Sequence, residues 1–321
     1  MKLRSLSAAF AFAAVFALIS SAPPAFAAAA ASIPPPVTCD RQCLYRVLDQ
    51  YLVGLKAKDT RQVRWAARVR NTENNVELRV GDGLWGTITA LGDYQMRIAD
   101  PATGQVAVYG VVTESDTSSP FATRLRVENG AVAEAETLVA RPQEAGVAFV
   151  TADIKPLPVW DEILPPERRV SREQMVVVAN GYFDTLQLND GTLHVQFDER
   201  CDRRENGAIA THRTDPTLDE IWNLGCADQF RLGAYRYDDR LRDRRFLMID
   251  EERGIILAGG FIDHEGKLDQ MPLTNGGTRQ AHYRRPHSFV LLEAFKVDSG
   301  KIRQVEAVFH TVPYNMPSPW R

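Results

Sequence analysis

The chain lacks a strong charge of either sign and lacks the motifs by which several enzyme classes are recognised. Its 38 basic and 41 acidic residues leave a formal net charge of -3 over 321 residues. This charge argues against non-specific electrostatic binding of nucleic acid. No HExxH motif, P-loop, Rossmann glycine pattern or GxSxG elbow is present. The sequence therefore gives no support to a zinc protease, a nucleotide-binding enzyme or a serine hydrolase.

Long apolar runs are also missing after the first residues. A short basic region precedes the apolar run Ala8–Ile19, and Ala25-Phe26-Ala27 offers the small residues that signal peptidase reads. The run is too short for a permanent membrane anchor, which needs about 20 residues. We expect a cleaved signal peptide over residues 1–27, a leader over 28–38 with no membrane anchor, and a periplasmic or secreted protein.

Cysteine is scarce, and none of its four residues forms a CxxC pair. An even number of cysteines in an oxidising compartment favours two disulfides. We expect one pair in each half, Cys39 with Cys43 and Cys201 with Cys226. The second pair would close a loop of some two dozen residues and contribute about 3 kcal/mol, whereas the first would add little. The alternative is a metal site, which the scattered histidines disfavour.

What the chain does contain is a repeat. Leu125–Glu136 (LRVENGAVAEAE) returns as Phe295–Glu306 (FKVDSGKIRQVE) at an offset of 170 residues. Each copy predicts a strand, a tight turn at Asn129-Gly130 or Ser299-Gly300, and a second strand. Two such hairpins, each far downstream of a matching helix, indicate a duplicated domain.

An amphipathic helix begins each copy. Asp40–Asp59 carries an apolar stripe at helical spacing, and its first residue suits an N-cap. The second helix begins after Ser171, with Gln174 at the capping-box position. At an offset of 131 residues, Tyr51 of the first helix matches Tyr182 of the second.

A proline-rich stretch divides the two copies. Residues 142–169 predict a linker that packs on a surface, which gives a first domain over 39–141 and a second over 170–321. The second copy is longer, with expected loop insertions at Ala208–Gly225 and Glu265–Pro286. Loops held by a rigid scaffold often carry function.

These features resemble the SnoaL-like branch of the NTF2-like superfamily. The resemblance lies in the helix with an internal Tyr and a closing Asp, the Glu-Asn at the start of a strand, and the final hairpin. The phrases GDGLW, RDRRF and VPYNMPSPW are similar to those of an exported family with two such domains. The resemblance implies an α+β fold of two tandem cones, each a curved antiparallel sheet wrapped on helices around a pocket. Relatives include cofactor-free isomerases, dehydratases and lyases but also binding modules, so fold does not settle function.

The resemblance also implies roles for two residues. Tyr182 would donate a hydrogen bond to a substrate oxygen, as in the ketosteroid-isomerase type of cone. Glu205 lies near where such enzymes place a carboxylate base, although Asp is usual there. The alternatives are that Tyr182 fills the core and that Glu205 caps a turn, as their counterparts Tyr51 and Glu73 would in the first half.

Histidine is absent from the first half and provides further candidates in the second. His212 lies in the first insertion, His264 ends a predicted central strand, and His310 lies on the last strand. Imidazole is the natural acid-base group at neutral pH. Strand alternation places Asp263 and His264 on opposite faces. Each histidine has the alternative of a structural hydrogen-bonding role.

Tyr235–Arg245 is the densest charged stretch and predicts a strand with Tyr235, Tyr237, Leu241 and Arg245 on one face. A solvated edge with weak ion pairs is the simpler interpretation. The alternative is an arginine that clamps an oxygenated substrate. Arg242 and Tyr237 are the candidates for substrate binding.

The sequence thus predicts an acid-base enzyme, an isomerase, dehydratase or lyase, that uses no cofactor or metal. It would act on an oxygenated, partly hydrophobic small molecule in the second domain. The catalytic candidates are Tyr182, Glu205, His212, His264 and His310. The competing hypothesis is a non-catalytic periplasmic module that binds a ligand or forms a homodimer. A pocket in the second domain with two or more titratable groups within hydrogen-bonding reach would favour the enzyme.

Overall fold

The computed structural model describes residues 39–142, 149–152, 154–214, 220–281 and 284–320, which belong to one compact unit. The predicted signal peptide and leader lie outside the described residues. Among the residues that are described, no helix is long and apolar enough to cross a membrane.

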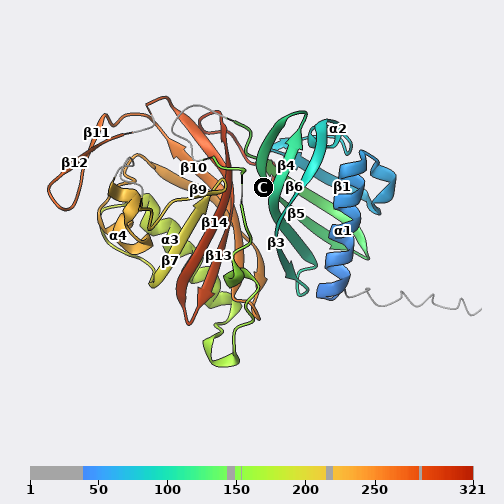
Figure 1. Ribbon diagram of the computed structural model, residues 1–321, viewed down its shortest axis with the longest axis horizontal. Coiled ribbons are helices and arrows are strands. Elements are labelled where there is room, and N and C mark those ends of the chain that lie inside the picture. Colours follow the sequence, from blue (N-terminus) through green and yellow to red (C-terminus); the bar gives the residue numbers. More distant parts are fainter. Residues whose placement is uncertain (1–38, 143–148, 153, 215–219, 282–283, 321) are drawn as a thin grey trace, which may run out of the picture. The chain divides into compact units, whose positions relative to one another are not determined.

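The described chain contains two copies of one arrangement (Figure 1). Helix α1 (Arg41–Ala57) precedes a six-stranded sheet of order β2-β1-β6-β5-β4-β3, and α3 (Arg172–Leu188) precedes one of order β8-β7-β14-β13-β10-β9. In each sheet one pair is parallel, β1 with β6 and β7 with β14. The predicted fold of two tandem NTF2-like α+β domains is confirmed.

The strands of the first sheet are β1 (Trp65–Glu73), β2 (Val76–Glu77), β3 (Ile88–Asp100), β4 (Gln105–Glu114), β5 (Thr117–Glu128) and β6 (Ala131–Val139). Those of the second are β7 (Phe197–Glu205), β8 (Ala208–Ile209), β9 (Arg240–Asp250), β10 (Ile255–His264), β13 (His287–Asp298) and β14 (Lys301–Val312). The short helices are α2 (Leu84–Thr87) and α4 (Cys226–Arg231), and a separate hairpin pairs β11 (Gln270–Pro272) with β12 (Thr278–Gln280).

Both leading helices begin where the capping residues predict. Asp40 accepts a hydrogen bond from the Cys43 amide at 2.8 Å, and Ser171 accepts one from the Gln174 amide at 3.2 Å. These side chains satisfy amide groups that the first helical turn leaves without a partner. The caps therefore fix the start of each helix locally, before tertiary packing.

The repeated hairpins also form as predicted, β5 with β6 and β13 with β14. Asn129 and Gly130 have φ angles of 51° and 73°, and Ser299 and Gly300 have 51° and 77°. Two successive positive φ angles are typical of a type I′ turn, which matches the twist of the strands it joins. The turn residues thus determine the register of each hairpin.

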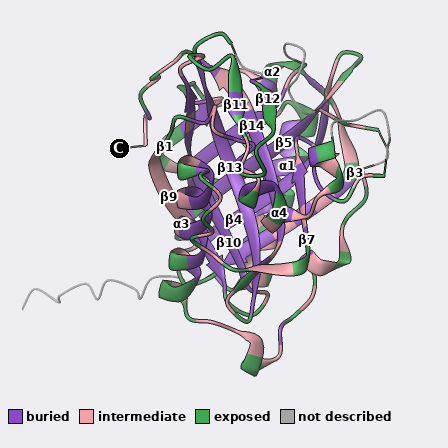
Figure 2. Cartoon of the chain, turned by 90° about the vertical axis from the view of Figure 1, so that its left-hand side faces the viewer, coloured by how far each residue is buried: buried purple, intermediate pink, exposed green. Residues whose placement is uncertain are grey.

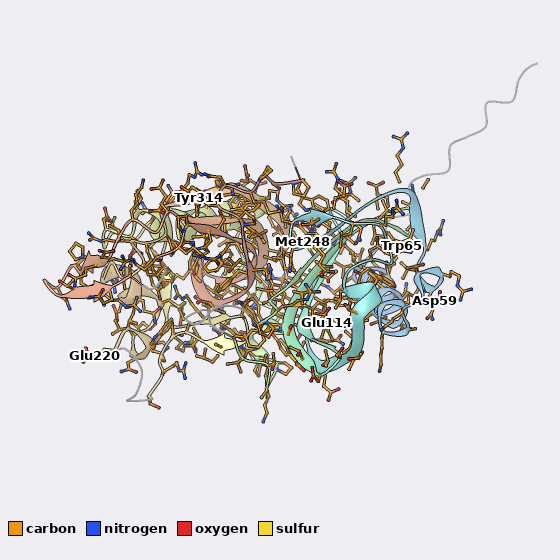
Figure 3. The ribbon with its side chains drawn as sticks, turned by 90° about the horizontal axis from the view of Figure 1, so that it is seen from above. Asp59, Trp65, Glu114, Glu220, Met248 and Tyr314 are labelled. Atoms are coloured by element: carbon orange, nitrogen blue, oxygen red, sulfur yellow. A yellow bond between two sulfur atoms is a disulfide. The ribbon has the colours of Figure 1, made fainter. Side chains whose placement is uncertain are left out.

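The two sheets face each other and bury their outer surfaces together, while α1 lies on the side of its sheet away from the other half (Figure 1). A single apolar cluster contains Tyr109 and Leu138 of the first sheet, and Leu292 and Met248 of the second. Figure 3 labels Met248, which belongs to β9. Trp160 of the linker joins this cluster. The interface explains why β13 is buried along its whole length (Figure 2), since helices cover its other face.

The structure pairs Cys39 with Cys43 and Cys201 with Cys226, as the sequence predicts. Both bonds favour an oxidising, extracytoplasmic environment. The second bond ties α4, which directly follows the first insertion, to β7. It thereby holds the C-terminal end of the insertion near β7, the strand that provides part of the cavity described below.

The predicted register of the charged stretch is wrong. Tyr235 and Tyr237 lie in turns before β9, which begins at Arg240. Within β9 the pairing with β10 shifts, and Asp243 has a φ of 51°. Such a bulge leaves one residue unpaired and reverses the alternation after it. Arg245 therefore lies at the interface and not on the face of Leu241, which packs in the second core.

Candidate active site

The interior of the second cone holds a cavity of ≈ 70 Å³. This volume admits a few water molecules or one compact polar group. Its apolar lining consists of Leu186, Ile262, Phe289, Leu291, Ala307 and Phe309. Its polar lining consists of Tyr182, Arg203, Glu205, Tyr235, Tyr237, Asp238, His264 and Glu293.

One row across the sheet places two carboxyl groups in this cavity. Glu293 of β13 lies opposite Ala307 of β14, which in turn lies opposite Glu205 of β7. Ala258 of β10 flanks Glu293 on the other side. Because neighbouring strands are about 4.8 Å apart, the small Ala307 leaves room between the two carboxyl groups. Strand alternation turns Arg203, two residues before Glu205, toward the same side.

Glu293 is held as a carboxylic acid at neutral pH. Burial raises its pKa to about 8, and the nearby Glu205 carboxylate adds to this increase. Arg203 and a hydrogen bond from Tyr182 lower the pKa but do not compensate for the burial. Tyr182 is itself buried, and burial raises the pKa of its hydroxyl. The cavity therefore contains a neutral Glu293 carboxyl group that can donate its O–H, and the Tyr182 hydroxyl donates to that carboxyl group.

Arg203 is fully buried and is held on three sides. Its Nη2 lies 3.1 Å from Glu205 Oε1 and donates to the Tyr235 hydroxyl at 2.5 Å. The Tyr235 hydroxyl donates onward to Gln229 of α4 at 2.8 Å. The guanidinium also lies 5.0 Å from the ring centre of Phe230. Glu205 thus has an ion-pair partner in Arg203.

A second pair of titratable groups lies beside the first. His264 Nε2 is 2.7 Å from Asp238 Oδ1, and both side chains are buried. Burial raises the pKa of Asp238, and the hydrogen bond with His264 acts in the opposite direction. The His264 ring stacks on His287, with ring centres 4.5 Å apart and planes inclined by 5°. Asp238 and His287 together fix the orientation of the imidazole.

The first cone has no comparable row of acids. The positions that match Glu293 and Ala307 are Thr123 and Thr137, whose hydroxyls hydrogen-bond each other at 3.0 Å. Tyr51 packs edge-on against Trp65 and Trp85, with ring centres 6.1 and 5.3 Å apart. Aromatic side chains therefore occupy the volume around the helical tyrosine in the first cone.

Glu73, the counterpart of Glu205, has a structural role. It accepts a hydrogen bond from the Leu84 amide at 2.6 Å at the start of α2. It also pairs with Arg141 at 2.7 Å, and Arg141 pairs with Glu114 at 2.7 Å. The capping alternative thus describes Glu73.

No group of three or more His, Cys, Asp or Glu side chains within the described ranges is arranged to hold a metal ion. The titratable groups of the cavity are engaged in pairs, one carboxylate with arginine and one with histidine. This donor set suits proton transfer, because each pair can gain or release a proton while its partner compensates the charge.

One family model matches residues 38–139 and 168–309, and it is described as a domain of unknown function, DUF8021. The chain belongs to this family. No protein of curated function matches the chain. The two matched regions of the DUF8021 model correspond to the two cones.

Solved structures resemble parts of this DUF8021 chain. A protein of unknown function with a cystatin-like fold from Methylobium petroleophilum PM1 is 17% identical, with a TM-score of 0.28, over 37% of this chain and 99% of that one. The pinacolase BvnE from Penicillium brevicompactum is 12% identical, with a TM-score of 0.23, over 43% and 84%. A phenazine biosynthesis-related protein from Pseudomonas aeruginosa is 10% identical, with a TM-score of 0.24, over 46% and 83%. Likenesses at this level transfer no activity.

Four of the residues proposed from the sequence meet in the cavity of this DUF8021 protein: Tyr182, Glu205, Tyr237 and His264. His264 and Asp263 face opposite sides of β10, as alternation predicts. His264 faces the cavity, and Asp263 hydrogen-bonds Ser288 and Arg240 outside it.

His212 and His310 lie elsewhere. His212 pairs with Asp202 at 2.7 Å on the outer surface, where its imidazole packs against Gly225. His310 lies on the interface face of β14 because it is one residue out of phase with Phe309, which lines the cavity. Burial lowers the pKa of His310 to about 4, and Arg141 adds to this effect.

Arg242 also lies outside the cavity. Its Nε contacts Asp263 at 2.9 Å, its Nη1 contacts Asp243 at 2.9 Å, and its Nη2 donates to the Met316 carbonyl at 2.7 Å. These contacts hold the C-terminal segment on β9 and β10. The arginine that lines the cavity is Arg203 of β7.

Sequence reasoning missed Glu293, Arg203 and Asp238. Glu293 had a readable signal, because it is the single acidic residue in the otherwise apolar run between Ser288 and Lys296. Arg203 lies among several arginines, and Asp238 lies in a turn that was predicted as strand. Because the residues next to Arg203 and Asp238 in the sequence are of similar type, only the tertiary structure shows that these two line the cavity.

Proposed function

We propose that the cavity of the second cone is the active site of an acid-base enzyme that works without a cofactor. The observation that carries this proposal is the shared cavity of Glu293, a buried acid with a pKa near 8, and Glu205, a carboxylate paired with Arg203 at 3.1 Å. Two carboxyl groups whose environments separate their protonation states can act as acid and base in one reaction.

In this proposal each group has a defined task. Glu205 removes a proton from a carbon next to a carbonyl group of the substrate. Tyr182 and the protonated Glu293 donate hydrogen bonds to the substrate oxygen, where negative charge develops. His264, oriented by Asp238, returns a proton to the substrate. Arg203 holds the Glu205 carboxyl group in place through their ion pair.

This division of labour fits an isomerase, a dehydratase or a lyase. Each of these reactions removes a proton from one position and delivers a proton to another without a net redox change. The substrate would be an oxygenated, partly hydrophobic small molecule, since Phe289, Phe309 and Leu291 line the cavity beside the polar groups. The motifs that resemble the SnoaL-like branch support the same reaction class. The two disulfides support a periplasmic or secreted location, which N-terminal sequencing of the mature protein would test.

The test is hydrogen-deuterium exchange at the carbon next to a carbonyl. A panel of small ketones, lactones and hydroxyketones is incubated with the protein in D₂O and followed by NMR. We expect exchange with at least one compound, and a decrease of about 10²- to 10⁴-fold in Glu205→Gln. His212→Ala, which changes a surface histidine outside the cavity, serves as the control and keeps the wild-type rate. Equal rates for Glu205→Gln and the wild type would refute the proposed base.

A second function is favoured for the first cone. Its interior is filled by Tyr51, Trp65 and Trp85, and its outer sheet face packs on the second cone. We propose that this half is a structural module that takes the place of a second subunit. Native mass spectrometry would then show a monomer, because the sheet faces that a homodimer would use are covered within the chain. A dimer would instead support the homodimeric module considered from the sequence.

A further inference from the structure

We propose that the cavity selects uncharged compounds with a hydrogen-bond-accepting oxygen and rejects carboxylates and amidinium groups of the same shape. The inference rests on the proposed function, whose site it shares, and it names the chemical class of the substrate. It follows from how the charged and polar groups of the cavity are already paired.

Each basic side chain in the described lining already has a carboxylate partner. Arg203 contacts Glu205 and Tyr235, and His264 contacts Asp238. A carboxylate entering this space would lie beside two acidic side chains and would lose its hydration without gaining a new ion pair. Burying an unpaired charge in this way is strongly unfavourable.

A cationic ligand meets a different obstacle. The charged or titratable groups that interact with Glu293 include Arg203 and Glu205 of β7, Tyr182 of α3, Asp238 of the turn before β9 and, from the other sheet, Tyr109 of β4. With Glu293 protonated, the paired groups leave the cavity close to electrically neutral. A cation would become favourable only after Glu293 releases its proton, which requires a pH above about 8.

An uncharged oxygen, in contrast, satisfies donors that the protein itself leaves open. The Nε of Arg203 is buried without a hydrogen-bond partner. The protonated Glu293 carboxyl group, to which the Tyr182 hydroxyl donates, adds one O–H donor. A buried donor without an acceptor is unfavourable, so a carbonyl or hydroxyl oxygen that accepts from these groups gains affinity.

The small volume limits what lies next to these donors. The cavity of ≈ 70 Å³ accommodates the oxygen and its attached atoms, while Tyr237, Phe289 and Phe309 offer aromatic surface to the rest of the compound. A flat carbonyl compound with one ring therefore matches the lining.

Benzamide, benzoate and benzamidine provide a matched set of probes, because they share one planar shape and differ in charge. Binding is followed by the methyl NMR signals of Leu186, Ile262 and Leu291, which line the cavity. At pH 6.5 we expect benzamide to bind at least tenfold more tightly than either charged analogue. As the pH rises above about 8, benzamide should weaken and benzamidine should strengthen, because Glu293 loses its proton.

Two variants locate the effect. Glu293→Gln keeps a neutral donor at every pH, so its affinity for benzamide should no longer change between pH 6.5 and 9.5. Glu306→Gln changes another buried glutamate with a raised pKa, at the interface outside the cavity, and should keep the wild-type dependence. If the affinity for benzamide stopped depending on pH in both variants, Glu293 would not be the specific source of the pH dependence and the inference would be overturned.

The outcomes separate this inference from the proposed function. If benzamide binds selectively but no carbon-bound hydrogen exchanges in D₂O, the selectivity stands and the enzyme proposal fails. If exchange occurs but benzoate or benzamidine binds as tightly as benzamide at pH 6.5, the selectivity is refuted. Failure of all three probes to shift the cavity methyl signals would also refute it.

Discussion

Arg172, the first residue of α3, donates a hydrogen bond at 2.6 Å to Asp100, the last residue of β3 in the other cone. The reverse contact joins Arg41, the first residue of α1, to Asp250, the last residue of β9, with 2.9 Å between Nη2 and Oδ1. Such reciprocal contacts are typical of an interface with twofold symmetry. The chain therefore reproduces within one polypeptide the geometry of a symmetric dimer.

The Arg172–Asp100 contact leads to a stability prediction. Asp100 has a side chain only 1% exposed, and its pairing with Arg172 helps to hold its pKa below the usual value against the opposing effect of burial. Arg172→Met would leave this carboxylate buried without its cation and should lower the free energy of unfolding by about 3 kcal/mol at pH 7. The loss should shrink as the pH falls below about 4, where the carboxyl group becomes protonated. Urea denaturation measures both effects.

The matched control for that variant is Arg61→Met, which breaks the exposed contact between Arg61 and Asp59. Exposed ion pairs contribute little to stability, so its denaturation midpoint should equal that of the wild type. An equal effect of the two variants would contradict the importance of the interface contact.

The two interface glutamates should respond to pH in opposite directions. Glu136 is buried between Arg124 and Arg245, whose charges lower its pKa despite burial. Glu306 is buried beside Tyr94 and Arg204, and burial raises its pKa above the usual value. Stability from Glu136 is thus present above about pH 4.5 and lost on acidification. Stability associated with Glu306 is present at low pH and lost as the pH rises through its raised pKa.

Glutamine substitutions would reveal this difference. Glu136→Gln should be less stable than the wild type at pH 7, and the difference should begin to shrink only below about pH 4.5. Glu306→Gln should match the wild type at pH 4 and equal or exceed it at pH 7. Melting temperatures across pH 4 to 8 provide the measurement, and parallel curves for the two variants would contradict the prediction.

Glu293 should make the protein less stable at alkaline pH. Its pKa near 8 lies above the ordinary value of 4.5, so the unfolded chain releases this proton first. Relative to Glu293→Gln, the wild type should lose up to about 1.4 kcal/mol per pH unit between pH 4.5 and 8. Calorimetry of both proteins tests this, with Glu199→Gln as an exposed control. A constant difference across this range would show that Glu293 is ionised when folded.

The two disulfides should differ in their contributions. Cys201 and Cys226 are 25 residues apart and Cys39 and Cys43 are 4 apart. Replacing Cys201 and Cys226 with serine should lower the free energy of unfolding by about 3 kcal/mol. Replacing Cys39 and Cys43 with serine should lower it by much less. Because the longer bridge holds α4 on β7, its loss should also broaden the methyl NMR signals of the cavity. Equal effects of the two changes on the unfolding midpoint would contradict this prediction.

Local sequence features determined the helices, the caps and the hairpins of this protein. Asp40, Ser171 and the Asn129-Gly130 and Ser299-Gly300 turns act through bonds to residues a few positions away, so their effects can be read without the fold. Alternation along strands also separated Asp263 from His264 correctly. The duplication itself was visible because both copies preserve these local signals.

The tertiary structure alone decided which groups form the site. Glu293 and Glu205 are brought to one row by the register of three strands, with Ala307 between them. A bulge at Asp243 and a turn at Tyr235–Asp238 overrode the predicted alternation. The packing of one sheet on the other placed His310 at the interface and left the cavity to Arg203, Glu293 and Asp238. Register and packing depend on contacts between residues far apart in the chain, which no local pattern records.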